Sequence, residues 1–168
     1  FKPKVRPSDN PLFVHKSKKE DLTLLVTEVP EYANTLMDLF WPGPITFVMK
    51  KKEHISYKVT GGLETVAVRM PDHPIARLLI SLSGKPIAAP SANLSGKPSP
   101  TSGKYVKEDL MGRVDCIVSA GDCEVGLEST VLDVTGEIPV ILRPGKVTQE
   151  QIIEVVGACE LDPAIRGE

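Results

Sequence analysis

The sequence predicts an α/β fold, built as a single domain around a mixed β-sheet. Apolar runs of strand length alternate with segments whose apolar residues recur every three or four positions, which is typical of interleaved strands and helices. The 168 residues fit one domain with a sizeable core, and no internal repeat interrupts them. Hydrophobic residues make up 41% of the chain and charged residues 25%, which is typical of a folded domain rather than a disordered one.

The N-terminal half is predicted to alternate strands with helices. Ser17 and Glu20 have the spacing of a capping box, which predicts a short helix over 17–25. A second helix is predicted over 31–40, where apolar residues recur at helical spacing and a Trp-Pro-Gly-Pro segment follows. Residues 50–62 are polar and end in Gly-Gly, which predicts a loop or hairpin. Runs of β-branched and aromatic residues predict strands over 11–15, 45–49 and 65–69.

A third helix is predicted to follow the Pro-Asp-His-Pro turn. It carries Ile75, Leu78, Leu79 and Leu82 on one face, and Gly84 ends it. The other elements predicted after it are a helix over 104–111 and strands over 86–90, 116–119, 130–134 and 140–142, the first of these strands being buried.

The last predicted helix begins with a capping box. Thr148 and Gln151 have the required spacing, and apolar residues continue to Val156. Residues 161–168 carry no pattern, so we predict one domain over 1–157 and a tail or linker over 158–168.

Charge and cysteine content exclude several classes of protein. Twenty basic and 22 acidic residues give a net charge of −2, which excludes a strongly basic nucleic-acid coat. The three cysteines form no C-x-x-C pair and the three histidines lack metal-ligand spacing, so we expect no disulfide framework, no metal site and a cytoplasmic protein. No apolar run approaches the ~20 residues of a membrane span, so we expect no membrane association.

Four basic residues are candidates for binding an anion. Lys4 and Arg6 are two positions apart, which places both side chains on one face of an extended segment, although their spacing alone favours a solvated basic terminus. Arg69 and Arg143 each end a β-rich run and precede a proline. An arginine at a strand end lies at the rim of the sheet, where α/β proteins bind ligands, and a rim salt bridge is the alternative.

Hydroxyl and amide side chains gather near other predicted strand ends. Ser91 and Asn93 directly follow the 86–90 strand and open a Ser/Pro/Gly-rich loop over 91–103, long enough to suggest function. Ser129 stands at the start of the 130–134 strand, and His15 ends the first strand. Each has a simpler explanation as a locally satisfied polar residue. Together with the four basic residues they predict a cleft that binds an anionic nucleotide beside a small polar substrate.

Six segments form an ordered series of motifs over nearly the whole chain. They are K-x-R-P-x-D-N-P-L-x-V-H (4–15), F-W-P-G-P-I-T (40–46), T-V-A-V-R-M-P-D-H-P (65–74), A-P-S-A-N-x-S-G-x-P-S-P-T (89–101), G-x-x-S-T-V-L-D (126–133) and L-R-P-G (142–145). Together these segments resemble the YrdC-like family, the threonylcarbamoyl-AMP synthases of tRNA modification. The paired K-x-R and S-x-N elements are the specific part of this resemblance.

The resemblance implies a twisted mixed sheet with a positively charged concave cavity. It also implies a reaction: ATP, L-threonine and bicarbonate give threonylcarbamoyl-AMP and pyrophosphate. Threonine and bicarbonate form a carbamate, whose oxygen attacks the α-phosphorus of ATP. Because the nucleophile is already anionic, the site has mainly to hold two anions together and offset their charge. Mg²⁺ is expected on the triphosphate rather than in a protein cage.

The resemblance also implies site residues and partners. Lys4 and Arg6 are expected to act in catalysis, and Arg69 to grip the threonine carboxylate with its guanidinium fork. A downstream tRNA threonylcarbamoyl transferase complex is the expected partner, with a weak tRNA contact. The implied ATP-binding residues are Lys4, Arg6, Asn10, Thr65, Ser91, Asn93, Ser99 and Arg143, and the threonine-binding residues are His15, Arg69, Ala89 and Ser129.

The sequence departs from the family pattern at its start. The family carries a P-T-[ED]-T-x-Y-G-L-type motif before K-x-R, where part of its threonine pocket lies, and this sequence begins at K-x-R. We therefore expect an incomplete chain. Two other functions stay open: an RNA-binding accessory protein without synthase activity, and a carbamoyl-adenylate-using relative like the modules of hydrogenase-maturation proteins.

Overall fold

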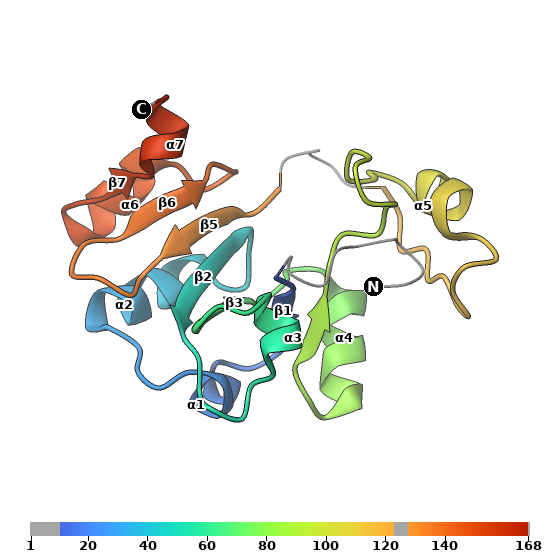
Figure 1. Cartoon of the computed structure of the whole chain (residues 1–168), viewed down its shortest axis with the longest axis horizontal. Coiled ribbons are helices and arrows are strands. Elements are labelled where there is room, and N and C mark those ends of the chain that lie inside the picture. The colour runs from blue at the N-terminus through green and yellow to red at the C-terminus, as the bar shows by residue number, and fades with distance from the viewer. Residues whose placement is uncertain (1–10, 123–127, 168) are drawn as a thin grey trace.

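The computed structural model describes residues 11–122 and 128–167 (Figure 1). Within them one seven-stranded sheet has the order β4-β1-β3-β2-β5-β6-β7. The strands are β1 (Phe13–His15), β2 (Ile45–Lys50), β3 (Thr65–Arg69), β4 (Ile87–Ala89), β5 (Thr130–Asp133), β6 (Val140–Arg143) and β7 (Glu160–Leu161).

The predicted mixed sheet is confirmed. β1 and β3, β2 and β5, and β6 and β7 pair in parallel, whereas β1 and β4, β2 and β3, and β5 and β6 pair antiparallel. The helical elements are η2 (Lys19–Asp21), α1 (Leu22–Leu25), α2 (Glu31–Phe40), α3 (Tyr57–Thr60), α4 (Pro74–Ser83), α5 (Gly103–Leu110), α6 (Gln149–Val156) and α7 (Pro163–Arg166).

Along the central strands, alternate residues point into the hydrophobic core and away from it, so the sheet has two distinct faces. Val14 of β1, Val68 of β3 and Phe47 of β2 are buried in one hydrophobic core. α2 and α6 pack against each other and contribute Leu36 and Ile152, both fully buried, to the same core. Because successive strand residues point to opposite faces, the residues between these core positions lie on the other face.

The Trp-Pro-Gly-Pro segment after α2 closes this core. The Trp41 ring packs edge-on against Phe47 with centroids 5.0 Å apart, and its indole nitrogen donates to the Ile45 carbonyl at 2.9 Å. Lys16, fully buried, places its ammonium 4.6 Å from the centre of the Trp41 ring and donates to the Lys18 carbonyl. Burial lowers the pKa of Lys16 to about 8, because the charged form loses its water.

Several local predictions are confirmed. The helices over 31–40 and 104–111 appear as α2 and α5, and the helix carrying Leu78 appears as α4. Thr148 and Gln151 form both hydrogen bonds of the capping box at the start of α6. Most predicted strands appear within one or two residues of their expected bounds.

Other predictions are wrong. Ser17 does not cap a helix: the chain enters a 3-10 turn after Lys18, without a side-chain cap, and continues into one turn of α1. α3 lies inside the predicted loop over 50–62, capped by Ser56, whose hydroxyl accepts from the Lys58 amide at 3.2 Å. Residues 116–119 form no strand.

The strand predicted as buried at 86–90 is instead an exposed edge. β4 pairs only with β1 within the described residues, and Ile87 is 37% exposed. A short apolar run thus predicts a strand without revealing its place in the sheet. Residues 160–166, for which no element was predicted, form β7 beside β6 and the short α7, and Leu161 packs on the core. Where the domain ends stays a prediction.

No helix among residues 11–122 and 128–167 has both the length and the apolar character needed to cross a bilayer.

Candidate functional site

A row of polar residues crosses the middle of the sheet opposite the core. His15 of β1 pairs with Arg69 of β3, and Arg69 pairs with Thr46 of β2. Residues in register on neighbouring strands project to the same side, and the intervening positions Val14 and Val68 are in the core. We call this surface, with Ser129 and Arg143 described next, the site face.

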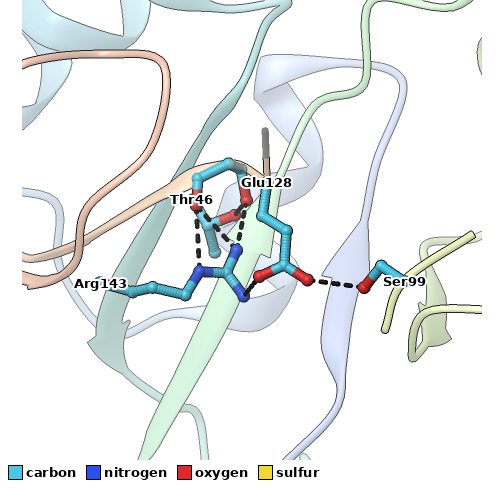
Figure 2. Close-up of polar contacts among 5 residues, drawn as sticks. Thr46, Ser99, Glu128 and Arg143 are labelled. Atoms are coloured by element: carbon cyan, nitrogen blue, oxygen red, sulfur yellow. Dashed lines mark hydrogen bonds and ion pairs between the residues drawn. The ribbon is translucent and has the colours of Figure 1, made fainter. Parts of the chain in front are cut away.

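Ser129 and Arg143 join the site face through direct hydrogen bonds (Figure 2). The Ser129 and Thr46 hydroxyl oxygens lie 2.9 Å apart. Arg143 donates from Nε and Nη2 to the Ser129 carbonyl at 3.2 and 2.7 Å, and from Nη2 to the Ser129 hydroxyl at 3.2 Å. The guanidinium also lies 5.3 Å from the centre of the Phe13 ring of β1. The arginine is therefore oriented from two sides, by a carbonyl and by an aromatic ring.

Glu128 connects Arg143 to the loop after β4. Its Oε2 lies 2.9 Å from Arg143 Nη1, and its Oε1 accepts from the Ser99 hydroxyl at 2.6 Å (Figure 2). Ser99, Glu128 and Arg143 come from three segments far apart in the sequence. The geometry thus brings the 91–103 loop, which was predicted to be functional, to the ends of β5 and β6.

A glycine lets the turn after β6 approach Ser129. A Cβ atom on Gly145 would lie 2.4 Å from the Thr130 nitrogen, 2.5 Å from the Glu128 carbonyl oxygen and 2.7 Å from the Ser129 carbonyl carbon. All three are backbone atoms, so no side-chain rotation relieves the clash. The glycine of the L-R-P-G segment therefore permits this close approach of the turn to the Ser129 backbone, which Arg143 binds.

His15 and Arg69 influence each other electrostatically. Burial lowers the pKa of His15 below its usual 6.5, and the positive charge of Arg69 lowers it further, while hydrogen bonds with the Ile87 and Phe13 backbones act in the opposite direction. At neutral pH His15 is therefore an uncharged imidazole beside a fixed cation. Arg69 also donates from Nε to the Gly43 carbonyl at 3.5 Å.

The loop after β4 is held by its own side chains. Asn93, 5% exposed, donates from Nδ2 to the Leu94 and Lys97 carbonyls, both at 2.8 Å. Its Oδ1 is buried without a hydrogen-bond partner among the described residues. Asp109 of α5 accepts from the Leu94 amide and from Lys97 Nζ. Asn93 therefore shapes this loop, and its contact with a nucleotide stays a prediction.

The structure brings together five of the residues named from the sequence: His15, Arg69, Ser99, Ser129 and Arg143. Ala89 lies beside them, opposite Phe13 in the β1–β4 pair, and Ser91 follows two residues later. Thr65 is on the same face of β3 as Arg69 but at the other end of the strand, roughly 13 Å away at the usual rise per residue. Lys4, Arg6 and Asn10 lie outside the described residues.

Three residues of the site were not singled out from the sequence. Thr46 and Glu128 stand inside the motifs quoted above, and Phe13 lies between Lys4 and His15 in another. A threonine in an otherwise apolar strand was a usable signal, because a hydroxyl at a buried position needs a partner. Glu128 and Phe13 gave no such signal, since exposed glutamates and strand phenylalanines are common.

Comparison with known proteins agrees with this architecture. Residues 1–145 match the model of the Sua5/YciO/YrdC family, described as telomere recombination. The chain belongs to this family. Threonylcarbamoyl-AMP synthase of Pyrococcus abyssi is 52% identical over 168 residues, which is 100% of this chain and 49% of that protein. The Bacillus subtilis protein of the same name is 53% identical over 166 residues, which is 98% of this chain and 48% of that protein.

A solved structure of a Sua5/YciO/YrdC member has the same fold. The crystal structure of P. abyssi Sua5 complexed with L-threonine gives a TM-score of 0.96 at 52% identity, covering 100% of this chain and 49% of that one. The present chain thus spans about half the length of the relatives it matches. The individual roles of the residues on the site face stay predictions.

Proposed function

We propose that this chain carries the substrate site of a threonylcarbamoyl-AMP synthase, which makes threonylcarbamoyl-AMP and pyrophosphate from ATP, L-threonine and bicarbonate. Two relatives of more than 50% identity bear that name, and one relative was solved with L-threonine. The observation that carries the proposal is the site face itself. It aligns two arginines with hydroxyl groups and a neutral histidine, which suits the joint binding of two anionic substrates.

The threonine half of the site is proposed around Arg69. A guanidinium fork binds a carboxylate through two parallel hydrogen bonds, which a lysine cannot do. His15, uncharged at neutral pH, adds a donor or acceptor without repelling the threonine ammonium group. The Ser129 hydroxyl and the Ala89 backbone complete the set.

The nucleotide half is proposed around Arg143 and the loop after β4. The Glu128 carboxylate already links Ser99 to Arg143. Ser91 and Asn93 belong to the same loop as Ser99. Lys4, Arg6, Asn10 and Thr65 are proposed to hold the remainder of the nucleotide, with Lys4 and Arg6 facing the triphosphate. MgATP is the substrate, and its Mg²⁺ offsets part of the charge on the phosphates.

In the proposed reaction the protein mainly holds the substrates together. The threonine amine, once its ammonium proton has passed to solvent, attacks bicarbonate, and water leaves to give the carbamate. The carbamate oxygen then forms a bond to the α-phosphorus of ATP, and the bond from that phosphorus to the bridging oxygen of pyrophosphate breaks. In this second step both electron pairs stay with oxygen, so no oxidant, reductant or added proton is needed. Fixed cations near both anions lower the barrier by holding them together and offsetting the developing charge.

Pyrophosphate release by the full-length protein tests the proposal. Release from ATP is expected only when both threonine and bicarbonate are present. Arg69→Ala is expected to raise the KM for threonine by about 10- to 100-fold, because it removes hydrogen bonds to a charged group. Arg77→Ala is the matched control, since it removes the same charge from an exposed position on α4.

Two other outcomes would point to a different function. Pyrophosphate release that does not depend on threonine would contradict the synthase activity. RNA binding with a steep salt dependence, and no pyrophosphate release, would support an RNA-binding accessory protein. A cytoplasmic location, supply of the product to a tRNA threonylcarbamoyl transferase complex and a weak tRNA contact are further parts of the proposal, testable by cell fractionation and by reconstitution with that complex.

A further inference from the structure

Glu128 takes up hydrogen-bond donors that a nucleotide would need. Ser99 has one hydroxyl proton, and it points to Glu128 Oε1 at 2.6 Å. Arg143 Nη1 faces Glu128 Oε2 at 2.9 Å (Figure 2). An ionised carboxylate and a phosphate group are both anions that only accept hydrogen bonds. They therefore compete for the same protons, and their negative charges repel each other when both are close.

Arg143 does not depend on Glu128 for its orientation. Its Nε and Nη2 bind the Ser129 carbonyl, and Nη2 also binds the Ser129 hydroxyl. The Phe13 ring lies against the guanidinium as well. Removing the Glu128 carboxylate would leave these contacts in place and free Nη1 for another anion.

The Glu128 carboxylate can also leave at little cost. Its side chain is 47% exposed and that of Arg143 is 37% exposed. Exposed ion pairs contribute little to stability, because water solvates both partners when they separate. A carboxylate in this position is a weak internal substitute for a ligand anion rather than a permanent part of the framework.

We propose that Glu128 is an internal competitor of the nucleotide, which occupies Arg143 and Ser99 in the free protein and is displaced by a phosphate group on binding. The inference rests on the proposed function, because it takes Ser99 and Arg143 to be nucleotide ligands. Glu128 then sets how tightly ATP binds and how readily the adenylate product leaves. Displacement also breaks the hydrogen bond that ties the 91–103 loop to the end of β5.

Calorimetric titration of the full-length protein with MgATP, without threonine, tests the competition. Glu128→Gln keeps the size of the side chain and removes its charge. It is expected to bind MgATP about twofold to fivefold more tightly than the natural protein, the range expected for losing an exposed ionic competitor. The gain is expected to shrink as salt rises from 50 to 500 mM, because screening weakens the repulsion that the substitution removes.

Asp38→Asn is the matched control. Asp38 forms an exposed ion pair with Lys19 at 2.6 Å and belongs to α2, which packs on the other face of the sheet. Asp38→Asn changes the net charge by the same amount as Glu128→Gln. Unchanged MgATP affinity in Asp38→Asn would therefore show that the gain in Glu128→Gln comes from the position of Glu128 and not from the net charge. Weaker or unchanged binding by Glu128→Gln, while the natural protein and Asp38→Asn bind MgATP, overturns the competition and leaves the proposed function standing. Absence of MgATP binding by all three proteins overturns both.

Discussion

α2 and α4 have the same length and similar apolar patterns, yet they have different surroundings. In α2 the apolar face is covered: Leu36 is fully buried, and Ala33 and Met37 are buried beside it. In α4 the equivalent face is open, with Leu79 49% exposed and Leu82 76% exposed. α4 lies next to β4 at one end of the sheet, and α6 and α7 lie toward the other end (Figure 1).

The difference shows what helical periodicity can and cannot predict. Apolar residues at helical spacing specify a helix and the face that avoids water, but they do not specify what covers that face. Around β2, β5 and β6 the covering elements are within the described chain. Around α4 and β4 the described residues leave the apolar face uncovered. Stability is therefore expected to depend on the first region much more than on the second.

Truncating one leucine in each helix is expected to give the largest contrast. Leu36→Ala leaves a cavity in a fully buried site, so it should lower the free energy of unfolding by about 2–5 kcal/mol. Leu82→Ala removes a side chain that is 76% exposed and should change it by less than about 0.5 kcal/mol. Urea denaturation of both variants measures the two values. Equal losses would show that α4 is covered in solution and would break the contrast.

Two glycines near β5 and β6 offer a sharper contrast within the covered region. Gly145→Ala places a methyl group against the backbone of residues 128–130 and is expected to cost about 1–3 kcal/mol in unfolding free energy. Gly136→Ala meets no atom closer than 3.9 Å, the Ile138 carbonyl oxygen, and is expected to be neutral or slightly stabilising. Thermal unfolding compares them directly. If both variants unfold like the natural protein, the close approach at Gly145 does not hold Ser129 in place.

Protonation of His15 is expected to have a smaller effect on stability. His15 belongs to β1, which lies between β3 of the central sheet and the edge strand β4. Its folded-state pKa lies below 6.5, so the unfolded chain takes up a proton first and stability falls as the pH drops below about 6.5. Arg69→Gln removes the neighbouring charge and should raise the pKa of His15 toward 6.5. The stability lost on acidification should then be smaller. NMR titration of the imidazole measures the pKa of His15 in both proteins. Arg77→Gln on α4 serves as the control, and an equal shift there would argue against a specific effect of Arg69.

Most of the helices and strands were predictable from the sequence, but how deeply each is buried was not. α6 was predictable because the two members of its capping box, Thr148 and Gln151, are only three positions apart, and α2 because its apolar residues are regularly spaced. The exposure of β4 depends on its place at the edge of the sheet, which pairing decides and local sequence does not. The prediction of a strand over 116–119 was wrong because these residues have strand propensity but, among the described residues, no neighbouring strand to pair with.

The candidate site was predictable as a set of residues but not as a geometry. Arg69 and Arg143 stood out because both end β-rich runs. The contacts that join them to their neighbours depend on long-range register: His15 meets Arg69 across the β1–β3 pair, and Glu128 meets Ser99 from 29 positions away. Only the folded sheet brings such distant segments together.

The most direct test of the site face is NMR mapping of L-threonine binding to the full-length protein, in the presence of MgATP. Signals of the His15 imidazole, the Arg69 Nε–H and the Ser129 amide are expected to shift together and to saturate at one affinity, while those of Leu78 and Leu82 on α4 stay unchanged. Shifts confined to α4, or no shifts on the site face at saturating threonine, would contradict the placement of the substrate site.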